Sequence, residues 1–213
     1  MKRRFALLSL IFLPLFASAE PSKDAEKSTP APATKVSKVK FSTSHGDFVI
    51  ELNSEKAPVT TANFLSYVNK KHYDGTVFHR VIDAFMIQGG GFSLSDGKLI
   101  EKEVGKGIIN EGQNGLKNER GSIAMARTSD PNSATAQFFI NVKNNPMLDY
   151  PNNGGYAVFG KVVSGMEVVD KMKVVATHTA PLMMQHPVTG EKIEAPAGDV
   201  PVETILIKSA SAE

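Results

Sequence analysis

Residues 78–92 read FHRVIDAFMIQGGGF, in which large apolar side chains surround one guanidinium (Arg80) and one amide (Gln88). The apolar runs predict two short strands that break near Asp83-Ala84, and the three glycines predict a bend where a strand leaves the sheet. The stretch contains no serine or cysteine nucleophile and no pair of carboxylates. A site built on it would therefore hold and polarise a bound group rather than form a covalent bond with it.

Short strands and two helices are predicted on both sides of this stretch. Alternating apolar residues predict a β-hairpin over 36–52, and apolar residues at helical spacing predict a helix over 58–70. Glycine-rich loops are expected up to about residue 121, and a long proline-containing loop over 180–200. The other predicted elements are strands and one short helix, at 122–126, 137–142, 157–163, 165–172 (the helix) and 204–207. Many short strands separated by turns predict a closed barrel or a sandwich.

The first predicted helix is amphipathic. One face, at helical spacing, holds Ala62, Phe64, Leu65 and Val68, and the other holds Thr60, Thr61, Asn63 and Asn69. We therefore expect the first group to pack against the core and the threonines to face solvent.

The N-terminus has the three parts of a secretory signal peptide. A basic segment, Lys2-Arg3-Arg4, precedes an apolar segment over 5–16 that is too short to span a bilayer. Ala17-Ser18-Ala19 supplies the small-residue pattern of a cleavage site, so cleavage is expected after Ala19. A retained interfacial anchor is the alternative. The predicted organisation is a signal peptide, a disordered linker and one folded domain, at 1–19, 20–35 and 36–213.

Charge and cysteine content fit an exported protein. The chain has 24 basic and 22 acidic residues. Without Lys2, Arg3 and Arg4 the counts are 21 and 22, a net charge of −1 with neutral histidines, so no nucleic-acid partner is expected. There is no cysteine, so the domain must be stable without disulfides. An exported, cysteine-free chain is typical of a bacterial periplasm, which is the predicted location.

Several kinds of catalytic or cofactor site have no motif in the sequence. The five histidines show neither H-x-H nor H-E-x-x-H spacing and there is no thiolate, so a zinc site is not expected. Gly89-Gly90-Gly91 is not followed by G-K-[ST] and does not begin a G-x-G-x-x-G motif, so a nucleotide phosphate loop is not expected. No G-x-S-x-G motif is present. We expect neither a metal nor a cofactor.

Three segments, in register over roughly residues 38–208, together resemble the cyclophilin family of peptidyl-prolyl cis-trans isomerases. They are FHRVIDAFMIQGG at 78–90, GSIAMA with AQFFI at 121–126 and 136–140, and AVFGKV at 157–162. The chain is most similar to the bacterial periplasmic members. This similarity rests on the segment beginning Asn118-Glu119-Arg120-Gly121, on the Gly155-Tyr156-Ala157 step and on the signal peptide. The resemblance implies a closed eight-stranded antiparallel β-barrel capped by two α-helices, with the active site on an outer face.

The reaction that the resemblance implies is rotation about an X-Pro peptide bond. Amide resonance holds the rotation barrier near ~20 kcal/mol, although the trans form is favoured by only ~0.5–1 kcal/mol. A cation presented to the prolyl nitrogen would stabilise the twisted amide preferentially, and Arg80 matches the family's catalytic arginine. By resemblance the catalytic residues are Arg80, Phe85, Gln88, Phe139 and Tyr156, and the substrate-binding residues are Met86, Ala126, Arg127, Gln137, Met147 and Leu148.

Several of these assignments have a structural alternative. At strand spacing, Phe85, Met86 and Phe139 would ordinarily belong to a core. With the resemblance, Phe138 stays in the core and Phe139, pointing the opposite way, belongs to the site. Arg80 could instead be a surface salt-bridge residue, and Arg127 could contribute only its backbone.

The chain departs from the family pattern at Tyr156, where many relatives have a histidine, and at three other places. Asp83-Ala84 stands where many relatives have Pro-Gly, and Gly91 where many have an acidic residue, so we expect a differently shaped bend. Met147 stands where relatives have the tryptophan whose indole donates a hydrogen bond to cyclosporin, and a thioether has no donor. Weak binding of cyclosporin is therefore expected.

Two functions are compatible with these features. The first is a peptidyl-prolyl isomerase that acts on unfolded or folding proline-containing polypeptides and assists the folding of exported proteins. The second is a proline-peptide binding module or chaperone on the same barrel. A purely structural envelope protein would not explain the full set of site residues. We expect a monomer without a stable membrane anchor.

Overall fold

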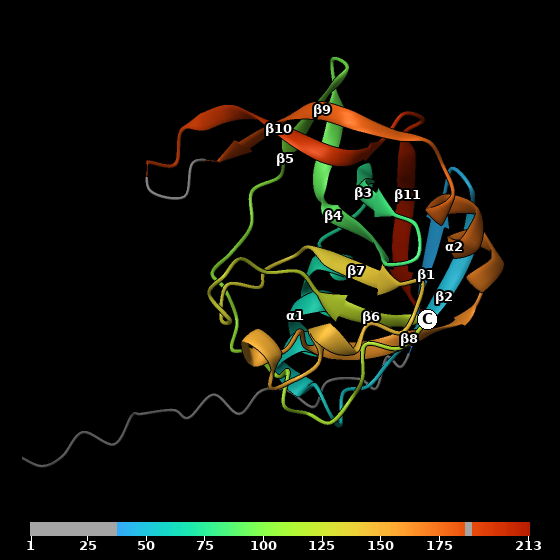
Figure 1. The fold of residues 1–213 in the computed structure, drawn as a ribbon, viewed down its shortest axis with the longest axis vertical. Coiled ribbons are helices and arrows are strands. Elements are labelled where there is room, and N and C mark those ends of the chain that lie inside the picture. Colours follow the sequence, from blue (N-terminus) through green and yellow to red (C-terminus); the bar gives the residue numbers. More distant parts are fainter. Residues whose placement is uncertain (1–37, 186–188) are drawn as a thin grey trace, which may run out of the picture. The chain divides into compact units, whose positions relative to one another are not determined.

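Eight antiparallel strands form a closed barrel in the computed structural model, which describes residues 38–185 and 189–213 (Figure 1). They follow one another around the barrel in the order β4-β3-β11-β1-β2-β8-β6-β7, and β7 pairs with β4 to close it. Their bounds are β1 Lys38–Thr43, β2 Gly46–Leu52, β3 Thr76–Ile82, β4 Met86–Ser95, β6 Ser122–Met125, β7 Phe138–Asn141, β8 Val158–Ser164 and β11 Ile205–Ala212. The predicted barrel is confirmed, whereas the predicted signal peptide and linker lie outside the described residues.

The barrel interior is an apolar core rich in aromatic rings. Val39 and Phe41 of β1 and Phe48 and Ile50 of β2 alternate with more exposed residues and are at most 1% exposed. Their pairing as a hairpin places the rings of Phe41 and Phe48 in a parallel stack with centroids 4.9 Å apart. The period-two pattern of this hairpin thus puts one side of each strand into the core, as predicted.

Two α-helices, α1 (Pro58–Asn69) and α2 (Met166–Lys173), add side chains to the same core. Phe64 and Val68 of α1 are buried as predicted, but Ala62 is exposed, and Thr60 and Thr61 are both buried. Thr60 is buried because its backbone amide and its hydroxyl both donate to the carboxylate of Glu111, which covers the start of the helix. None of the helices in the described ranges is long and apolar enough to cross a bilayer.

The three glycines of β4 lie where this strand changes partners. Residues 86–89 pair with β7 in the barrel wall, and residues 92–95 pair with β5 (Lys98–Glu101) outside it. Gly90 has φ +84°, and a Cβ there would lie 2.8–2.9 Å from the rings of Tyr73 and Phe138. The backbone therefore leaves the barrel wall at a position that only glycine can occupy without strain.

The prediction of a long loop over 180–200 is wrong, because this region forms two antiparallel strands, β9 (Thr177–Gln185) and β10 (Lys192–Pro201). With β5 they extend the sheet beyond the barrel, at the top of Figure 1. Pro181 and Pro196 favour a loop in the sequence, but they lie opposite each other in the register and β10 is an edge strand. We call the pair β9–β10 the ribbon.

A second apolar cluster holds the ribbon against the barrel. Leu182 of β9 and Val200 of β10 are at most 4% exposed and pack with Val77 of β3 and Phe92 of β4. Because β3 and β4 also carry residues 80–88, this cluster fixes the ribbon beside that part of the barrel wall.

Candidate active site

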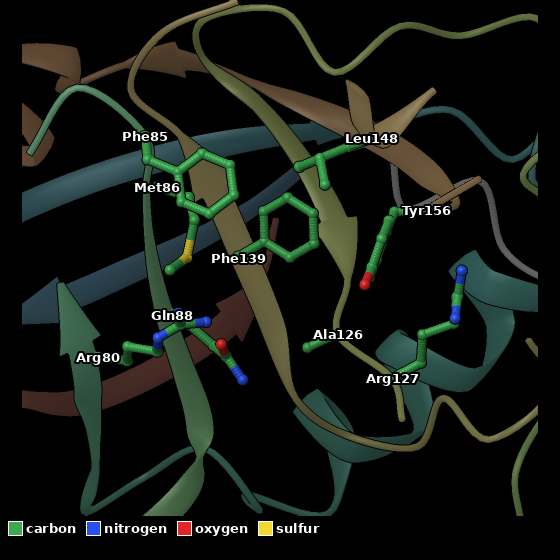
Figure 2. A pocket seen from close by; sticks show the side chains of 9 residues that line it. All are labelled: Arg80, Phe85, Met86, Gln88, Ala126, Arg127, Phe139, Leu148 and Tyr156. Atoms are coloured by element: carbon green, nitrogen blue, oxygen red, sulfur yellow. The ribbon is translucent and has the colours of Figure 1, made fainter. Parts of the chain in front are cut away.

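A pocket of about 120 Å³ lies on the outer face of the barrel wall, beside β3, β4 and β7 (Figure 2). Pockets for drug-sized ligands begin near ~300 Å³, so this one suits a single small ring. Nine residues line it: Arg80, Phe85, Met86, Gln88, Ala126, Arg127, Phe139, Leu148 and Tyr156. Each of them was predicted as a site residue.

Two polar side chains, Arg80 and Gln88, lie side by side on neighbouring strands. They are direct partners in the β3–β4 register and point to the same face (Figure 2). The Gln88 amide Nε2 donates to Oε1 of Gln137 over 2.9 Å, which fixes the orientation of both amides. The Arg80 side chain is 44% exposed, and its Nε lies 3.7 Å from Oδ2 of Asp199 on β10. Arg80 thus forms a surface ion pair, which was the alternative to a site role, and it also lines the pocket.

The floor of the pocket is apolar because β7 presents alternate side chains to opposite sides of the wall. Phe138 is fully buried in the barrel interior, and Phe139 packs in a separate cluster on the outer side with Met86. The edge of the Phe139 ring meets the Tyr156 ring with centroids 5.7 Å apart. The predicted division of Phe138 and Phe139 between core and pocket is confirmed.

Arg127 and Tyr156 form the other end of the pocket. The Arg127 guanidinium carbon lies 4.3 Å above the Tyr156 ring, a cation–π geometry. Its nitrogens donate to the backbone carbonyls of Thr128, Asn153 and Gly155. The Arg127 side chain is therefore held in place by the loop, and it stacks on Tyr156.

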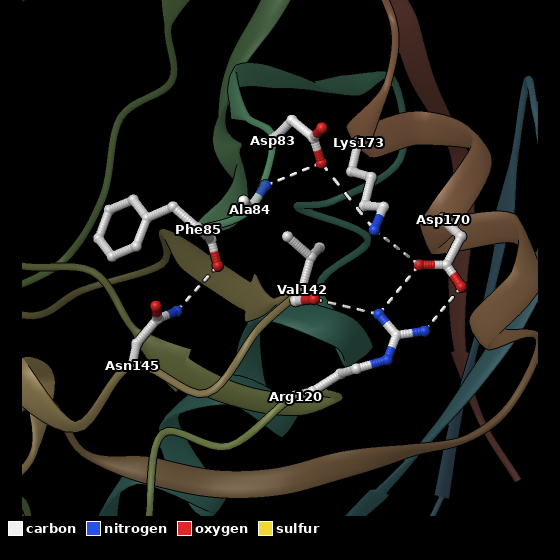
Figure 3. Close-up of polar contacts among 8 residues, drawn as sticks. All are labelled: Asp83, Ala84, Phe85, Arg120, Val142, Asn145, Asp170 and Lys173. Carbon is white, nitrogen blue, oxygen red and sulfur yellow. Dashed lines mark hydrogen bonds and ion pairs between the residues drawn. The ribbon is translucent and has the colours of Figure 1, made fainter.

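Phe85 reaches the pocket from the tight turn between β3 and β4 (Figure 3). In this turn Ala84 has φ +55°, and its N–H donates to the side chain of Asp83 over 2.8 Å. The Phe85 carbonyl accepts hydrogen bonds from Asn145 Nδ2 at 2.8 Å and from the backbone N–H of Val142 at 3.1 Å. The backbone on both sides of the Phe85 ring is thus fixed by hydrogen bonds.

Charged side chains connect this turn to α2 (Figure 3). Arg120 donates to both carboxylate oxygens of Asp170, at 2.9 and 2.7 Å, and to the carbonyl of Val142 at 3.1 Å. These hydrogen bonds hold the pKa of Asp170 below its usual value. Lys173 lies 3.5 Å from Asp170 and 3.9 Å from Asp83. The network ties the turn that carries Phe85 to a helix of the core.

The charges that line the pocket are those of two arginines, since the other seven lining residues are neutral. His79, next to Arg80 in β3, faces the opposite way and is 5% exposed. Burial, together with the nearby charge of Arg80, lowers the pKa of His79 to about 3, so this imidazole is neutral at neutral pH. Arg80 therefore supplies the charge at this end of the pocket, and the lining includes no carboxylate and no histidine.

Two of the predicted substrate-binding residues lie outside the pocket lining. Gln137 does not line the pocket itself but accepts a hydrogen bond from the lining residue Gln88, and its side chain packs over Gly91. Met147 lies on the 3-10 turn η1 (Pro146–Leu148) and is 58% exposed, next to the lining residue Leu148. Conversely, the ion-pair partner of Arg80, Asp199, was missed because it belongs to the segment predicted as a loop.

Comparison with known proteins identifies the family to which this chain belongs. Residues 38–196 match the family described as "Cyclophilin type peptidyl-prolyl cis-trans isomerase/CLD". The chain belongs to the cyclophilin family. It is 49% identical over 179 residues to a peptidyl-prolyl cis-trans isomerase of Streptomyces antibioticus, covering 82% of this chain and 98% of that one. Escherichia coli peptidyl-prolyl cis-trans isomerase B is 47% identical over 173 residues, which cover 79% of this cyclophilin and 98% of the relative.

A solved structure shows the same fold. The crystal structure of a Cryptosporidium parvum cyclophilin-type isomerase, in the presence of the dipeptide Ala-Pro, matches with a TM-score of 0.63 at 27% identity. The match covers 83% of this cyclophilin and 98% of the other chain. The sequence-based assignment to a bacterial cyclophilin with isomerase activity is therefore confirmed by family, relatives and fold.

Proposed function

We propose that this cyclophilin accelerates rotation about X-Pro bonds at the described pocket, with Arg80 as the catalytic residue. The observation that carries the proposal is the position of Arg80. Its guanidinium stands beside a small apolar pocket whose lining includes no nucleophile and no acid–base pair. Such a lining, without serine, cysteine, carboxylate or histidine, lacks the usual groups for covalent and acid–base catalysis, but it can polarise an amide held against it.

The barrier to rotation is electronic, so a charge in the right place is sufficient to lower it. Rotation removes the amide resonance that gives a barrier of ~18–20 kcal/mol, and the nitrogen lone pair becomes available in the twisted form. A guanidinium N–H directed at that lone pair interacts more strongly with the transition state than with the planar ground state. The charge of Arg80 is permanent, so this interaction does not depend on a proton transfer.

The other lining residues bind and orient the substrate in this proposal. Met86, Phe139 and Leu148 hold the proline ring and exclude water, which strengthens the interaction of the amide with Arg80. Phe85 completes the apolar wall and contacts the ring. Gln88, oriented by Gln137, binds the substrate backbone, and the Tyr156 hydroxyl donates to a substrate carbonyl. Ala126 and Arg127 line the groove for residues that flank proline.

The biological substrates that we propose are proline-containing segments of unfolded or folding exported proteins in the periplasm. The support is the basic, apolar and A-x-A order of residues 2–19, together with the absence of cysteine. The presence of Ala-Pro in the Cryptosporidium structure is consistent with this class of ligand. We further propose that the protein acts as a monomer without a membrane anchor and binds cyclosporin weakly.

The substitution Arg80→Ala separates isomerase function from peptide binding alone. Exchange NMR on an Ala-Pro peptide would measure both the cis-trans rate at saturation and the peptide Kd. We expect the rate to fall by about 100-fold or more, as for the loss of a transition-state donor, with little change in Kd. A folding assay for an exported protein then decides the role, because equal performance of wild type and Arg80→Ala would favour a proline-peptide binding module or chaperone.

A further inference from the structure

The ribbon carries a β-bulge that includes Asp199, the ion-pair partner of the pocket residue Arg80. Ala197 pairs with Ala180 and Val200 pairs with His178, so two residues of β10, Gly198 and Asp199, face a single residue of β9. Asp199 has φ +61°, the left-handed conformation that aspartate tolerates better than most residues. Bulges at this kind of place redirect a side chain out of the regular alternation of a strand.

The bulge directs the Asp199 carboxylate toward Arg80. Oδ2 lies 3.7 Å from Nε of Arg80, and both side chains are 44% exposed. An ion pair with this exposure contributes little to folding stability, so stability does not explain why the strand is distorted to form it. A strained backbone that yields no stability is more simply explained by a function.

The position of the bulge is well fixed. Val200, the next residue after Asp199, is 3% exposed and packs against Val77 of β3, the strand that carries Arg80. The eight barrel strands close on one another without the ribbon. The ribbon is therefore an added layer whose packing sets the Asp199 carboxylate at a defined place relative to β3.

The contact leaves the reactive end of Arg80 free. Asp199 approaches Nε, the inner nitrogen of the guanidinium. In residues 38–185 and 189–213, the terminal nitrogens Nη1 and Nη2 of Arg80 have no hydrogen-bond partner, so they can meet a bound amide. A long side chain held at Nε samples fewer orientations and loses less freedom when it binds substrate.

We propose that Asp199 is a positioning residue that holds the Arg80 guanidinium in its catalytic orientation. This inference rests on the proposed role of Arg80. Asp199 acts by restricting the guanidinium at Nε, and it is not among the residues that line the pocket. The ribbon is thereby part of the catalytic apparatus, although it lies outside the barrel.

The test compares two variants at the bulge with one control on the same strand. Asp199→Gly removes the carboxylate and retains a residue that accepts the positive φ, and Asp199→Asn retains an oxygen without the charge. Glu194→Gln breaks another β10 ion pair, with Lys98 at 3.5 Å, away from Arg80. In exchange NMR on an Ala-Pro peptide, kcat/KM should fall roughly two- to five-fold in Asp199→Gly, less in Asp199→Asn, and not at all in Glu194→Gln.

Two further readouts distinguish positioning from a structural effect. The ¹⁵N relaxation of the Arg80 Nε–Hε group should show a lower order parameter in Asp199→Gly than in wild type. In an Arg80→Ala background, Asp199→Gly should change kcat/KM no further, since its effect passes through Arg80. An unchanged kcat/KM or order parameter in Asp199→Gly, or an equal loss in the Arg80→Ala background, would overturn the inference while the proposed function stands. If the single variant Arg80→Ala retained wild-type activity, the proposed function would be contradicted, and the inference about Asp199 would fail with it.

Discussion

Arg80 and His79 are neighbours in β3 that face opposite sides of the barrel wall and behave differently for that reason. Arg80 is half exposed and keeps its charge at the rim of the pocket. His79 is buried against Phe92, with ring centroids 4.6 Å apart, and its Nδ1 has no hydrogen-bond partner among the described residues. The His79 imidazole is therefore buried away from the pocket, and the permanent charge of Arg80 remains at its rim.

His79 should make the protein sensitive to acid. Its pKa is about 3 in the folded protein, below its ordinary value of 6.5, so from pH 6.5 downward the unfolded chain binds a proton that the folded one does not. Stability is therefore fully present above pH 6.5, and by pH 4 the loss from this group is about 3 kcal/mol.

The measurement is urea unfolding at pH 7 and pH 4 for wild type and His79→Leu. The variant should lose less stability between the two pH values, and the difference between the two proteins isolates this histidine from other titrating groups. His178→Gln, at an exposed position, should behave as wild type. An identical pH dependence in wild type and His79→Leu would show that His79 is not the origin of the acid sensitivity.

Met147 should limit the affinity for cyclosporin. Its exposed thioether offers no hydrogen-bond donor beside the pocket, whereas an indole does. Met147→Trp should tighten binding by about ten-fold, as expected for one added hydrogen bond, and Met147→Phe should tighten it less. The chain has no other tryptophan, so fluorescence of the introduced one reports binding directly. Nanomolar binding by wild type would refute the expectation of weak binding.

At the residue scale, local periodicity and resemblance could predict most of the pocket from the sequence. The opposite directions of Phe138 and Phe139 result from strand geometry, and the pocket residues from Arg80 to Tyr156 lie in or beside the segments that match the family. Asp199 could not be predicted, because its approach to Arg80 depends on a bulge in a distant strand. No sequence motif indicates that bulge.

Among the elements, the turn between β3 and β4 departs from the family pattern and yet adopts a strained conformation. Ala84 occupies the left-handed region at φ +55°, which glycine adopts without strain. The turn is held by Asp83, by the two bonds to the Phe85 carbonyl and by the network to α2 (Figure 3). The surrounding contacts thus impose a conformation that alanine disfavours.

Replacing Ala84 by glycine should stabilise the protein. It relieves a strain of ~1–2 kcal/mol, while glycine loses ~0.5–1 kcal/mol more backbone entropy on folding, which leaves a net gain of about 0.5–1 kcal/mol. The matched control is Ala62→Gly, at an exposed helical position of α1, which should lower stability by about 1 kcal/mol. Denaturant unfolding measures both. A loss of stability in Ala84→Gly comparable to the control would show that Ala84 is not strained.

The elements that the sequence predicted well are those with strong periodicity. The hairpin of β1 and β2, the helix α1 and the break between β3 and β4 were predicted within a few residues. The ribbon was not, because Pro181, Pro196 and Gly198 are ordinarily loop residues. Pro196 is tolerated on the edge strand β10, and Gly198 lies in the bulge. The predicted helix face was partly wrong. The carboxylate of Glu111, far along the chain, binds Thr60, and Thr61 is buried although its hydroxyl has no hydrogen-bond partner in the described part of the chain.

At the scale of the whole barrel, the pocket is built on the outer side of a closed wall whose inner side is the core. Phe138 and Phe139 are adjacent residues of one strand, and they pack on the inner and the outer side of the barrel wall respectively. A closed, densely packed wall keeps Arg80, Gln88 and Phe139 at fixed positions relative to one another, which is what preorganised charge stabilisation requires. The ribbon adds a further support at the rim.

The most direct test of the central claim is the cis-trans exchange rate of a saturating Ala-Pro peptide on wild type, Arg80→Ala and Arg80→Lys. If Arg80 stabilises the twisted amide, Arg80→Ala should lose about 100-fold or more in rate with a Kd within about three-fold of wild type. Arg80→Lys should recover only part of the loss, because an ammonium lacks the planar fork. A rate unchanged in Arg80→Ala, or a loss that appears only as a weaker Kd, would contradict a catalytic role for Arg80.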